Sequence, residues 1–173
     1  MGADLAGFLR RNNVDNVLLV PQQIDSLLDV PGGQDVLAAR NTVFYAGASL
    51  KSSTKASLDR ANVNLVSGYG LSEATACGLS VPHERPAELD GEWVKSVGAV
   101  NLRFDKYSEA EGGLPALYSL VVLDGFVPCP VHNIEGGYDT GDLVERHPDY
   151  PEWYRVYGRK SSMVSENDSH VHS

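Results

Sequence analysis

Residues 42–70 read TVFYAGASLKSSTKASLDRANVNLVSGYG, and this stretch carries the pattern that decides the fold. Its first four residues are β-branched or aromatic, which is typical of a strand. A polar helix is expected over residues 51–62, with Ser52 or Ser53 as its N-cap. A second short apolar run at residues 63–66 predicts another strand. A strand, a helix and a strand at this spacing are typical of a parallel α/β sheet.

The same pattern extends toward the N-terminus. An apolar run at residues 17–20 ends at Pro21, and we expect it to be a strand buried on both faces. Apolar residues at helical spacing flank this run: Leu5, Phe8 and Leu9 before it, and Ile24, Leu27 and Leu28 after it. A further short helix is expected at residues 36–37. Since ligands of such sheets bind beyond the carboxyl ends of the strands, the loops expected at residues 46–50 and 68–73 form the candidate binding region.

The composition indicates a globular protein rather than a disordered one. The chain has 173 residues, of which 42% are hydrophobic and 21% charged, and its formal net charge is -9. An acidic surface repels phosphate backbones, so we expect no general binding to nucleic acid. We expect no membrane partner either, because no apolar run approaches the roughly 18 residues that a membrane span needs. The first residues include an acid and no signal-peptide core, which predicts a cytoplasmic protein.

After about residue 92 the sequence changes character. Strand-like runs are joined by glycine and proline turns without an intervening helical pattern, and they lie at residues 97–104, 116–123 and 153–157. This pattern predicts a smaller antiparallel sheet or partial barrel. We therefore expect three segments, namely an α/β segment at residues 1–92, a small β subdomain at residues 93–160 and a polar tail at residues 161–173.

Three stretches of the chain carry candidate chemistry. They are Tyr45-Ala46-Gly47-Ala48-Ser49-Leu50, Gly68-Tyr69-Gly70-Leu71-Ser72-Glu73-Ala74, and Tyr138-Asp139-Thr140-Gly141-Asp142-Leu143 followed by Tyr157-Gly158-Arg159. In this order and spacing they resemble the core motifs of the adenylate-forming superfamily, which includes acyl-CoA synthetases, nonribosomal peptide synthetase adenylation domains and firefly luciferase. The resemblance covers roughly residues 5–160, and the Glu-Arg-His-Pro stretch at residues 145–148 looks most like fungal synthetase-like carboxylate reductases.

The resemblance implies an enzyme that binds ATP or AMP and uses Mg²⁺ to activate a carboxylic acid as an acyl-adenylate. It implies that Tyr69 stacks on adenine, that the Ser72 hydroxyl donates to a phosphate oxygen, and that Glu73 binds Mg²⁺. It also implies that Asp142 accepts hydrogen bonds from both ribose hydroxyls and that Arg159 binds the ribose or phosphate side. Ser72, Glu73 and Arg159 are thus the candidate catalytic residues.

Small residues complete the candidate nucleotide site. Gly47 and Ala48 are expected beside the ligand, because a glycine lets the backbone approach a flat ring closely, and Gly70 belongs to the tyrosine-glycine motif. Each candidate also has a purely structural alternative. The alternative for Gly47 is an ordinary turn. For Tyr69 it is a half-buried tyrosine at a strand end, for Ser72 a turn-capping serine, and for Glu73 a solvated surface acid. For Asp142 it is a turn aspartate, and for Arg159 a surface ion pair.

Two features of the superfamily have no counterpart in this sequence. No glycine-rich loop with a lysine precedes the motifs, and residues 52–55, Ser-Ser-Thr-Lys, lack the glycines that phosphate cradling needs. Ser161 stands where the superfamily has a hinge aspartate or lysine, and Lys160 does not match its catalytic lysine. We therefore expect the chain alone not to adenylate at a useful rate.

The missing elements also bear on stability and on partners. Absent upstream strands would leave a sheet edge and an apolar face uncovered, so we expect marginal stability or self-association. The complete parent enzyme is expected to pass its product to coenzyme A or to a carrier protein. The alternative function is that of a non-catalytic remnant, or an interaction module, derived from an adenylation domain.

Overall fold

The computed structural model describes residues 1–125 and 129–163, so most of the predicted polar tail lies outside the described residues. The chain folds as two compact units. The first contains Met1–Tyr69 and Leu79–Gly91, and the second contains Gly70–Gly78 and the chain from Glu92 onward. In the described part of the chain, no helix has the length and apolar character needed to cross a membrane.

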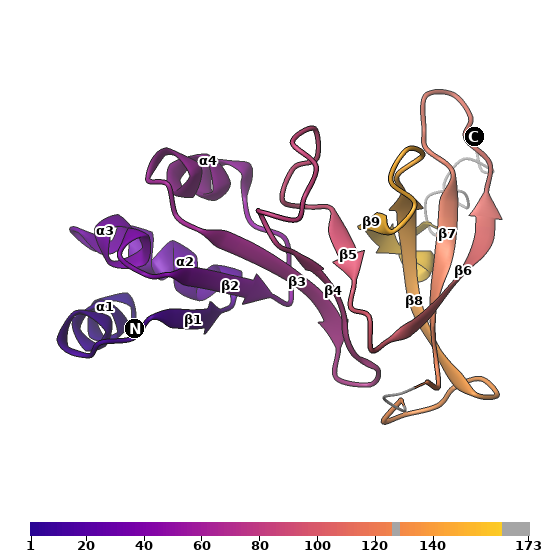
Figure 1. Cartoon of the computed structure of the whole chain (residues 1–173), viewed down its shortest axis with the longest axis horizontal. Helices are drawn as coiled ribbons and strands as arrows, with labels where there is room; N and C mark the ends of the chain where they lie inside the picture. Colours follow the sequence, from indigo (N-terminus) through magenta and orange to yellow (C-terminus); the bar gives the residue numbers. More distant parts are fainter. Residues whose placement is uncertain (126–128, 164–173) are drawn as a thin grey trace, which may run out of the picture. The chain divides into compact units, whose positions relative to one another are not determined.

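The first unit is a three-stranded parallel sheet with helices. Its helices are α1 (Gly2–Arg11), α2 (Pro21–Leu28), α3 (Gly33–Ala38) and α4 (Ser52–Arg60), and its strands are β1 (Asn16–Leu19), β2 (Thr42–Ala46) and most of β3 (Leu65–Leu71). The strands pair in chain order, β1 with β2 and β2 with β3, and both pairs are parallel (Figure 1). The predicted parallel α/β arrangement is therefore confirmed.

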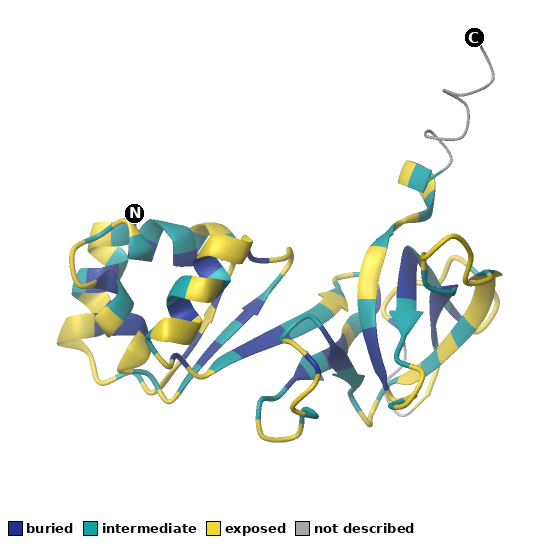
Figure 2. Cartoon of the chain, turned by 90° about the horizontal axis from the view of Figure 1, so that it is seen from above, coloured by how far each residue is buried: buried dark blue, intermediate teal, exposed yellow. Residues whose placement is uncertain are grey.

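The core of this unit lies on the helical face of the sheet. Ile24, Leu27 and Leu58 from the helices and Val43 from β2 have no exposed surface. Val17 and Leu19 of β1 join the same cluster, whereas Leu18 between them is 73% exposed. Figure 2 shows this contrast of buried and exposed positions along the strands. The prediction that residues 17–20 are buried on both faces is therefore wrong, because the described helices cover only one face of β1.

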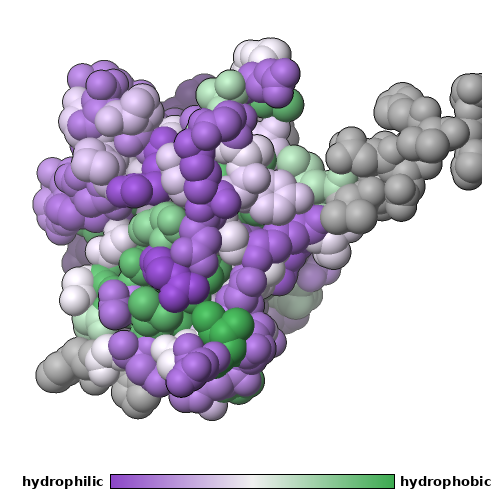
Figure 3. Space-filling view, turned by 90° about the vertical axis from the view of Figure 1, so that its right-hand side faces the viewer, coloured by the Kyte–Doolittle hydropathy of each residue, from purple (hydrophilic) through white to green (hydrophobic). Residues whose placement is uncertain are grey.

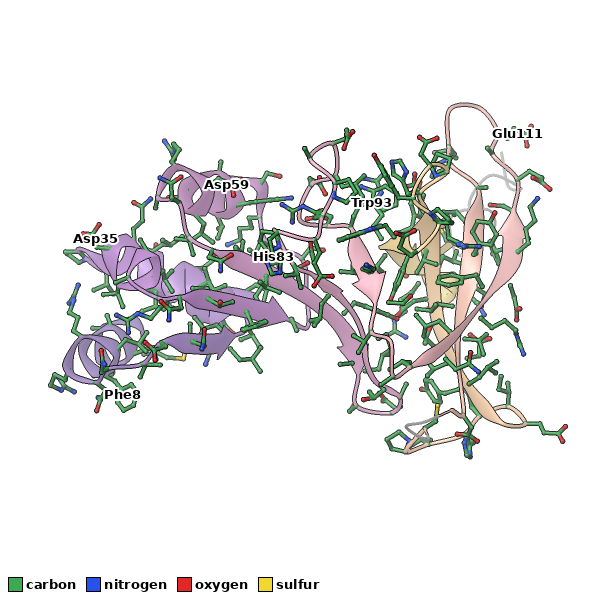
Figure 4. All side chains as sticks on the ribbon, viewed as in Figure 1. Phe8, Asp35, Asp59, His83, Trp93 and Glu111 are labelled. Carbon is green, nitrogen blue, oxygen red and sulfur yellow. The ribbon has the colours of Figure 1, made fainter. Side chains whose placement is uncertain are left out.

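We expect the exposed side chain of Leu18 to promote association between copies of the chain. β1 is the terminal strand of the sheet, and Phe8, which projects from α1 (Figure 4), is also half exposed. Leu18→Lys should raise the dissociation constant of the self-associated form about tenfold in sedimentation equilibrium, since an apolar contact is lost and a charge is added. Asn16→Lys, on the same face of the same strand, is the control for added charge. A wild-type chain that is monomeric at all concentrations would contradict this expectation.

The start of α4 differs from the sequence prediction. The N-cap is Lys51 and makes no side-chain cap bond, so neither Ser52 nor Ser53 has the predicted role. Instead, Asp25 of α2 accepts a hydrogen bond from Thr54 Oγ1 at 2.6 Å and an ion pair from Lys51 Nζ at 2.7 Å. A carboxylate near a helix N-terminus is favourable, and here it comes from a neighbouring helix.

Asp25→Ala should lower the free energy of unfolding by about 1–2 kcal/mol in urea denaturation, because the buried Thr54 hydroxyl loses its partner. The Lys51 and Thr54 hydrogen bonds lower the pKa of Asp25 below 3.8. The contribution of Asp25 to the free energy of unfolding is thus complete above the unfolded-state pKa, and it is lost as pH falls through the lower pKa of the folded state. Asp59→Ala, on the exposed side of α4 (Figure 4), is the matched control. Equal losses in both variants would show that Asp25 has no special role.

The second unit is an antiparallel sheet. Its strands are β4 (Thr75–Ser80, whose last two residues belong to the first unit), β5 (Val94–Ser96), β6 (Asn101–Ser108), β7 (Leu117–Leu123), β8 (Gly137–Arg146) and β9 (Trp153–Arg159). Five of them lie in the order β5-β9-β8-β7-β6, and each adjacent pair is antiparallel. The predicted antiparallel sheet is confirmed, although the strand expected at residues 97–104 begins only at Asn101, as β6, and residues 97–100 form a turn after the short strand β5.

Large side chains fill the interior of this unit. Trp153, Tyr154, Leu120 and Leu143 are essentially inaccessible to solvent. Trp93, marked in Figure 4, packs edge-on against the His147 ring with centroids 5.0 Å apart. Several apolar side chains stay exposed, among them Leu114, Val131 and Val156, and Figure 3 shows hydrophobic surface interspersed with hydrophilic residues. The sheet thus has a packed core that supports the motif-bearing strands β8 and β9.

Candidate functional site

The first unit holds the candidate residues that follow β2 and lie in β3. Gly47 and Ala48 come directly after β2 and are exposed, and Gly47 has φ 94°, a conformation that favours glycine. No atom lies within 4 Å of where a Gly47 side chain would begin, so the backbone there is open to close approach. Tyr69 is half-buried in β3, rather than in the loop that the sequence predicted for residues 68–73.

The second unit holds the serine-glutamate pair, in the turn between β3 and β4. Gly70 permits this hairpin, because a Cβ there would lie 2.6 Å from the Thr75 carbonyl oxygen. Ser72 Oγ donates to Glu73 Oε2 at 3.0 Å, and the Val131 amide donates to the Glu73 carbonyl at 3.1 Å. Thr75 has φ 121°, a strained value for a β-branched residue. The turn therefore has a defined shape, fixed by contacts on both of its sides.

The Glu73 carboxylate is ionised at neutral pH. Hydrogen bonding by its own backbone amide lowers its pKa most, followed by the Ser72 hydroxyl, and the positive charge of Arg159 acts in the same direction. An ionised, partly accessible carboxylate is a donor that fits Mg²⁺, which takes one or two protein carboxylates together with substrate phosphates. The described residues contain no cluster of three or more His, Cys, Asp or Glu side chains that would hold a metal ion without such a substrate.

Asp142 and Arg159 face each other across β8 and β9. They occupy paired positions in the antiparallel ladder, and Arg159 Nε lies 2.8 Å from Asp142 Oδ1. The Asp142 side chain is only 7% exposed, whereas that of Arg159 is 56% exposed. Arg159 Nη1 also donates to the Thr140 carbonyl oxygen at 2.9 Å. The structure thus brings together Asp142 and Arg159, two of the predicted site residues, in an ion pair whose carboxylate is buried.

The stretch of β8 before Asp142 is irregular. The β7–β8 register shifts between Ser119 and Val121, and Gly141 has φ 72°, a left-handed conformation for which glycine is suited. The Thr140 hydroxyl donates to the Leu120 carbonyl oxygen at 2.8 Å and accepts from the Asp142 amide at 3.1 Å. The Thr140 hydroxyl and the left-handed glycine therefore serve the backbone of this stretch.

A second ion pair, between Asp139 and Lys160, was not predicted from the sequence. Lys160 Nζ lies 2.7 and 2.9 Å from the two carboxylate oxygens of Asp139. Burial opposes ionisation of Asp139, but the Lys160 ammonium and the Gly141 amide lower its pKa overall. In the sequence, Asp139 precedes Asp142 by three residues and Lys160 follows Arg159 directly, but nothing there indicates that Asp139 and Lys160 form a pair.

No family model matches this chain. In sequence it is 26% identical over 155 residues to the adenylate-forming reductase Nps10 of Heterobasidion annosum, covering 87% of this chain and 14% of that protein. The chain therefore spans a small part of the length of this curated relative.

Solved structures with the same fold include acyl-CoA ligases. A malonyl-CoA ligase in a ternary product complex with methylmalonyl-CoA and AMP has a TM-score of 0.69 at 20% identity, covering 93% of this chain and 37% of that one. O-succinylbenzoate coenzyme A synthetase from Bacillus subtilis, in complex with AMP, has a TM-score of 0.66 at 15% identity, covering 93% of this chain and 34% of that one. In sequence the chain is thus similar to an adenylate-forming reductase, and in fold it is similar to these AMP-bound ligases.

Proposed function

We propose that this chain supplies the adenine-nucleotide contacts of an enzyme that activates a carboxylic acid as an acyl-adenylate. The observation that carries the proposal is the Asp142–Arg159 pair, because a nearly buried carboxylate held beside a guanidinium presents an acceptor for vicinal hydroxyls and a donor fork for a phosphate. The relatives support it, since one is named an adenylate-forming reductase and others were solved with AMP.

The proposed roles follow from the chemistry of each group. Asp142 accepts hydrogen bonds from the ribose hydroxyls while Arg159 turns toward the phosphate, and Tyr69 stacks on the adenine ring. The Ser72 hydroxyl donates to a phosphate oxygen, and the ionised Glu73 is the residue that would hold Mg²⁺. Bound Mg²⁺ would neutralise negative charge on the phosphates. Gly47, Ala48 and Gly70 are proposed to leave room for the nucleotide.

Isothermal titration of the chain with AMP tests this proposal. We expect saturable binding of AMP and binding about tenfold weaker for 2′,3′-dideoxy-AMP, which lacks the two hydroxyls that Asp142 would bind. Equal affinity for the two nucleotides would refute the ribose role of Asp142. Failure of AMP to bind to a folded chain would favour the alternative, a remnant or interaction module derived from an adenylation domain.

We expect the chain alone to bind nucleotide without forming an adenylate. Its sequence contains no glycine-rich loop with a lysine to meet the charge that develops on pyrophosphate, and stabilising that charge accounts for much of the rate in such reactions. ATP–pyrophosphate exchange should therefore stay at background with a range of carboxylic acids. Exchange at a rate comparable to that of a complete ligase would contradict this expectation.

We propose that the parent enzyme is a reductase related to nonribosomal peptide synthetases, because the Glu-Arg-His-Pro stretch at residues 145–148 resembles such reductases and the curated relative is named an adenylate-forming reductase. Such an enzyme would hold its activated acid on a carrier protein, whereas the ligases of similar fold use coenzyme A, as their names state. Which acid is activated, and which of these two acceptors is used, would be tested by assaying the full-length parent with both.

A further inference from the structure

Lys160 and Asp139 form an ion pair that no role above uses. The Lys160 ammonium contacts both carboxylate oxygens of Asp139, at 2.7 and 2.9 Å, and the two side chains are only 28% and 34% exposed. The Arg103–Asp105 pair on β6 is more exposed, since its two side chains are 49% and 47% exposed. A pair that is partly removed from water and in contact through both oxygens holds its geometry better than a solvated one.

Asp139 is held on its backbone as well as on its side chain. The Asn133 side chain accepts from the Asp139 amide at 2.7 Å and donates to the Asp139 carbonyl at 2.8 Å. The Asp139 carboxylate in turn accepts from the Gly141 amide at 3.0 Å. One carboxylate therefore connects the Lys160 ammonium to the left-handed glycine that precedes Asp142.

The pair lies at a stretch of β8 where the register with β7 is irregular. The β7–β8 register shifts between Ser119 and Val121, so β7 pairs with Leu143 and Asp139 of β8 but with none of residues 140–142 between them. On the other side, β9 pairs with Asp142 through Arg159. Two consecutive residues, Arg159 at the end of β9 and Lys160 directly after it, bind this stretch on both sides of Gly141. Arg159 binds Asp142, and Lys160 binds Asp139.

We propose that Lys160 and Asp139 are a positioning pair, which fixes the backbone of residues 139–142 and thereby aligns the Asp142 carboxylate with the Arg159 guanidinium for the nucleotide. Neither residue contacts the ligand in this scheme. The fixed backbone concerns this chain's own structure, whereas the alignment for the nucleotide rests on the proposed nucleotide function. A displaced Gly141 would move the Asp142 amide and carboxylate together, which is how a pair away from the ligand would change affinity.

The test combines amide hydrogen exchange with AMP titration in Lys160→Met, Lys160→Arg and Lys106→Met. Lys160→Met keeps the length and apolar stem but removes the charge, so we expect exchange at the Gly141 and Asp142 amides to quicken about three- to tenfold. Amides of β6 and β7 should not change. AMP affinity should fall by a similar factor. Lys160→Arg should restore both, and Lys106→Met, which removes the exposed pair with Glu109, should leave both as in the wild type.

The outcomes distinguish an effect on the backbone from an effect on nucleotide affinity. Unchanged exchange at Gly141 and Asp142 in Lys160→Met would overturn the proposal. Uniformly faster exchange throughout the second unit would also overturn it, because the pair would then only stabilise the fold. Local loosening without loss of AMP affinity would overturn the alignment of the nucleotide contacts. If the wild type binds no AMP, the proposed function fails, while the exchange data still decide whether the pair fixes the backbone.

Discussion

Asp142→Ala is expected to weaken AMP binding about 100-fold. The substitution removes an acceptor for two hydroxyls, each a charge-assisted hydrogen bond worth about 1.5–3 kcal/mol, and part of this loss is recovered by water. It also leaves Arg159 without the acid that sits 2.8 Å from its Nε. Titration calorimetry measures the effect directly. The salt concentration is kept constant, because both the ligand and the guanidinium are charged and salt screens their interaction.

Asp105→Ala is the matched control for this substitution. Asp105 also pairs with an arginine, Arg103 at 2.8 Å, in the same unit, but its side chain is 47% exposed. Asp105→Ala should leave AMP affinity unchanged. A folded Asp142→Ala chain that binds AMP as tightly as the wild type would show that this acid has only the structural role of a turn residue.

Gly70→Ala is expected to destabilise the chain by about 2–3 kcal/mol, at the upper end for overpacking. A Cβ at this position would lie 2.6 Å from the Thr75 carbonyl oxygen and 2.8 Å from Ala76 Cα, so backbone atoms rather than a flexible side chain would have to move. The shift would open the turn that carries Ser72 and Glu73. Urea denaturation monitored by tryptophan fluorescence measures the stability, and AMP titration in the presence of Mg²⁺ measures the effect on the site.

Gly158→Ala is the matched control, since this glycine also lies in a strand and has no atom within 4 Å of its would-be Cβ. It should change stability by less than about 1 kcal/mol. A Gly70→Ala chain as stable as Gly158→Ala would mean that the hairpin adjusts freely, and the close approach of its two strands would then not shape the turn.

The parallel sheet could be predicted because its residues are patterned in the sequence. The β-branched run at residues 42–45 and the helical spacing of Ile24, Leu27 and Leu28 each reflect burial in the same core. The exposure of Leu18 could not be predicted, because a run of four apolar residues does not reveal whether one face or two will be covered. That depends on which helices pack there.

The strands of the second unit were harder to predict where the backbone is irregular. β8 contains Thr140, Gly141 and Asp142, which read as a turn, yet the left-handed glycine is accommodated within a bulged strand. The same ambiguity made the end of β3 resemble a loop. In both places local turn chemistry serves to present a polar side chain from a strand.

The candidate residues were found by motif order, and their arrangement was not. The sequence gives no distance between Asp142 and Arg159, which the antiparallel register of β8 and β9 makes neighbours. Lys160 and Asp139 were missed for the same reason, because an ion pair between residues 21 positions apart is visible only once the strands are paired.

The most direct test of the nucleotide site is an AMP titration of the ¹⁵N-labelled chain followed by the amide resonances of Gly141 and Asp142. Binding through Asp142 and Arg159 predicts saturable shifts concentrated at residues 139–142 and 159, with the dissociation constant found by calorimetry, and their absence in Asp142→Ala. Saturable shifts confined to other residues, or no shifts in a folded chain, would contradict the assignment of this chain's motifs to adenine-nucleotide binding.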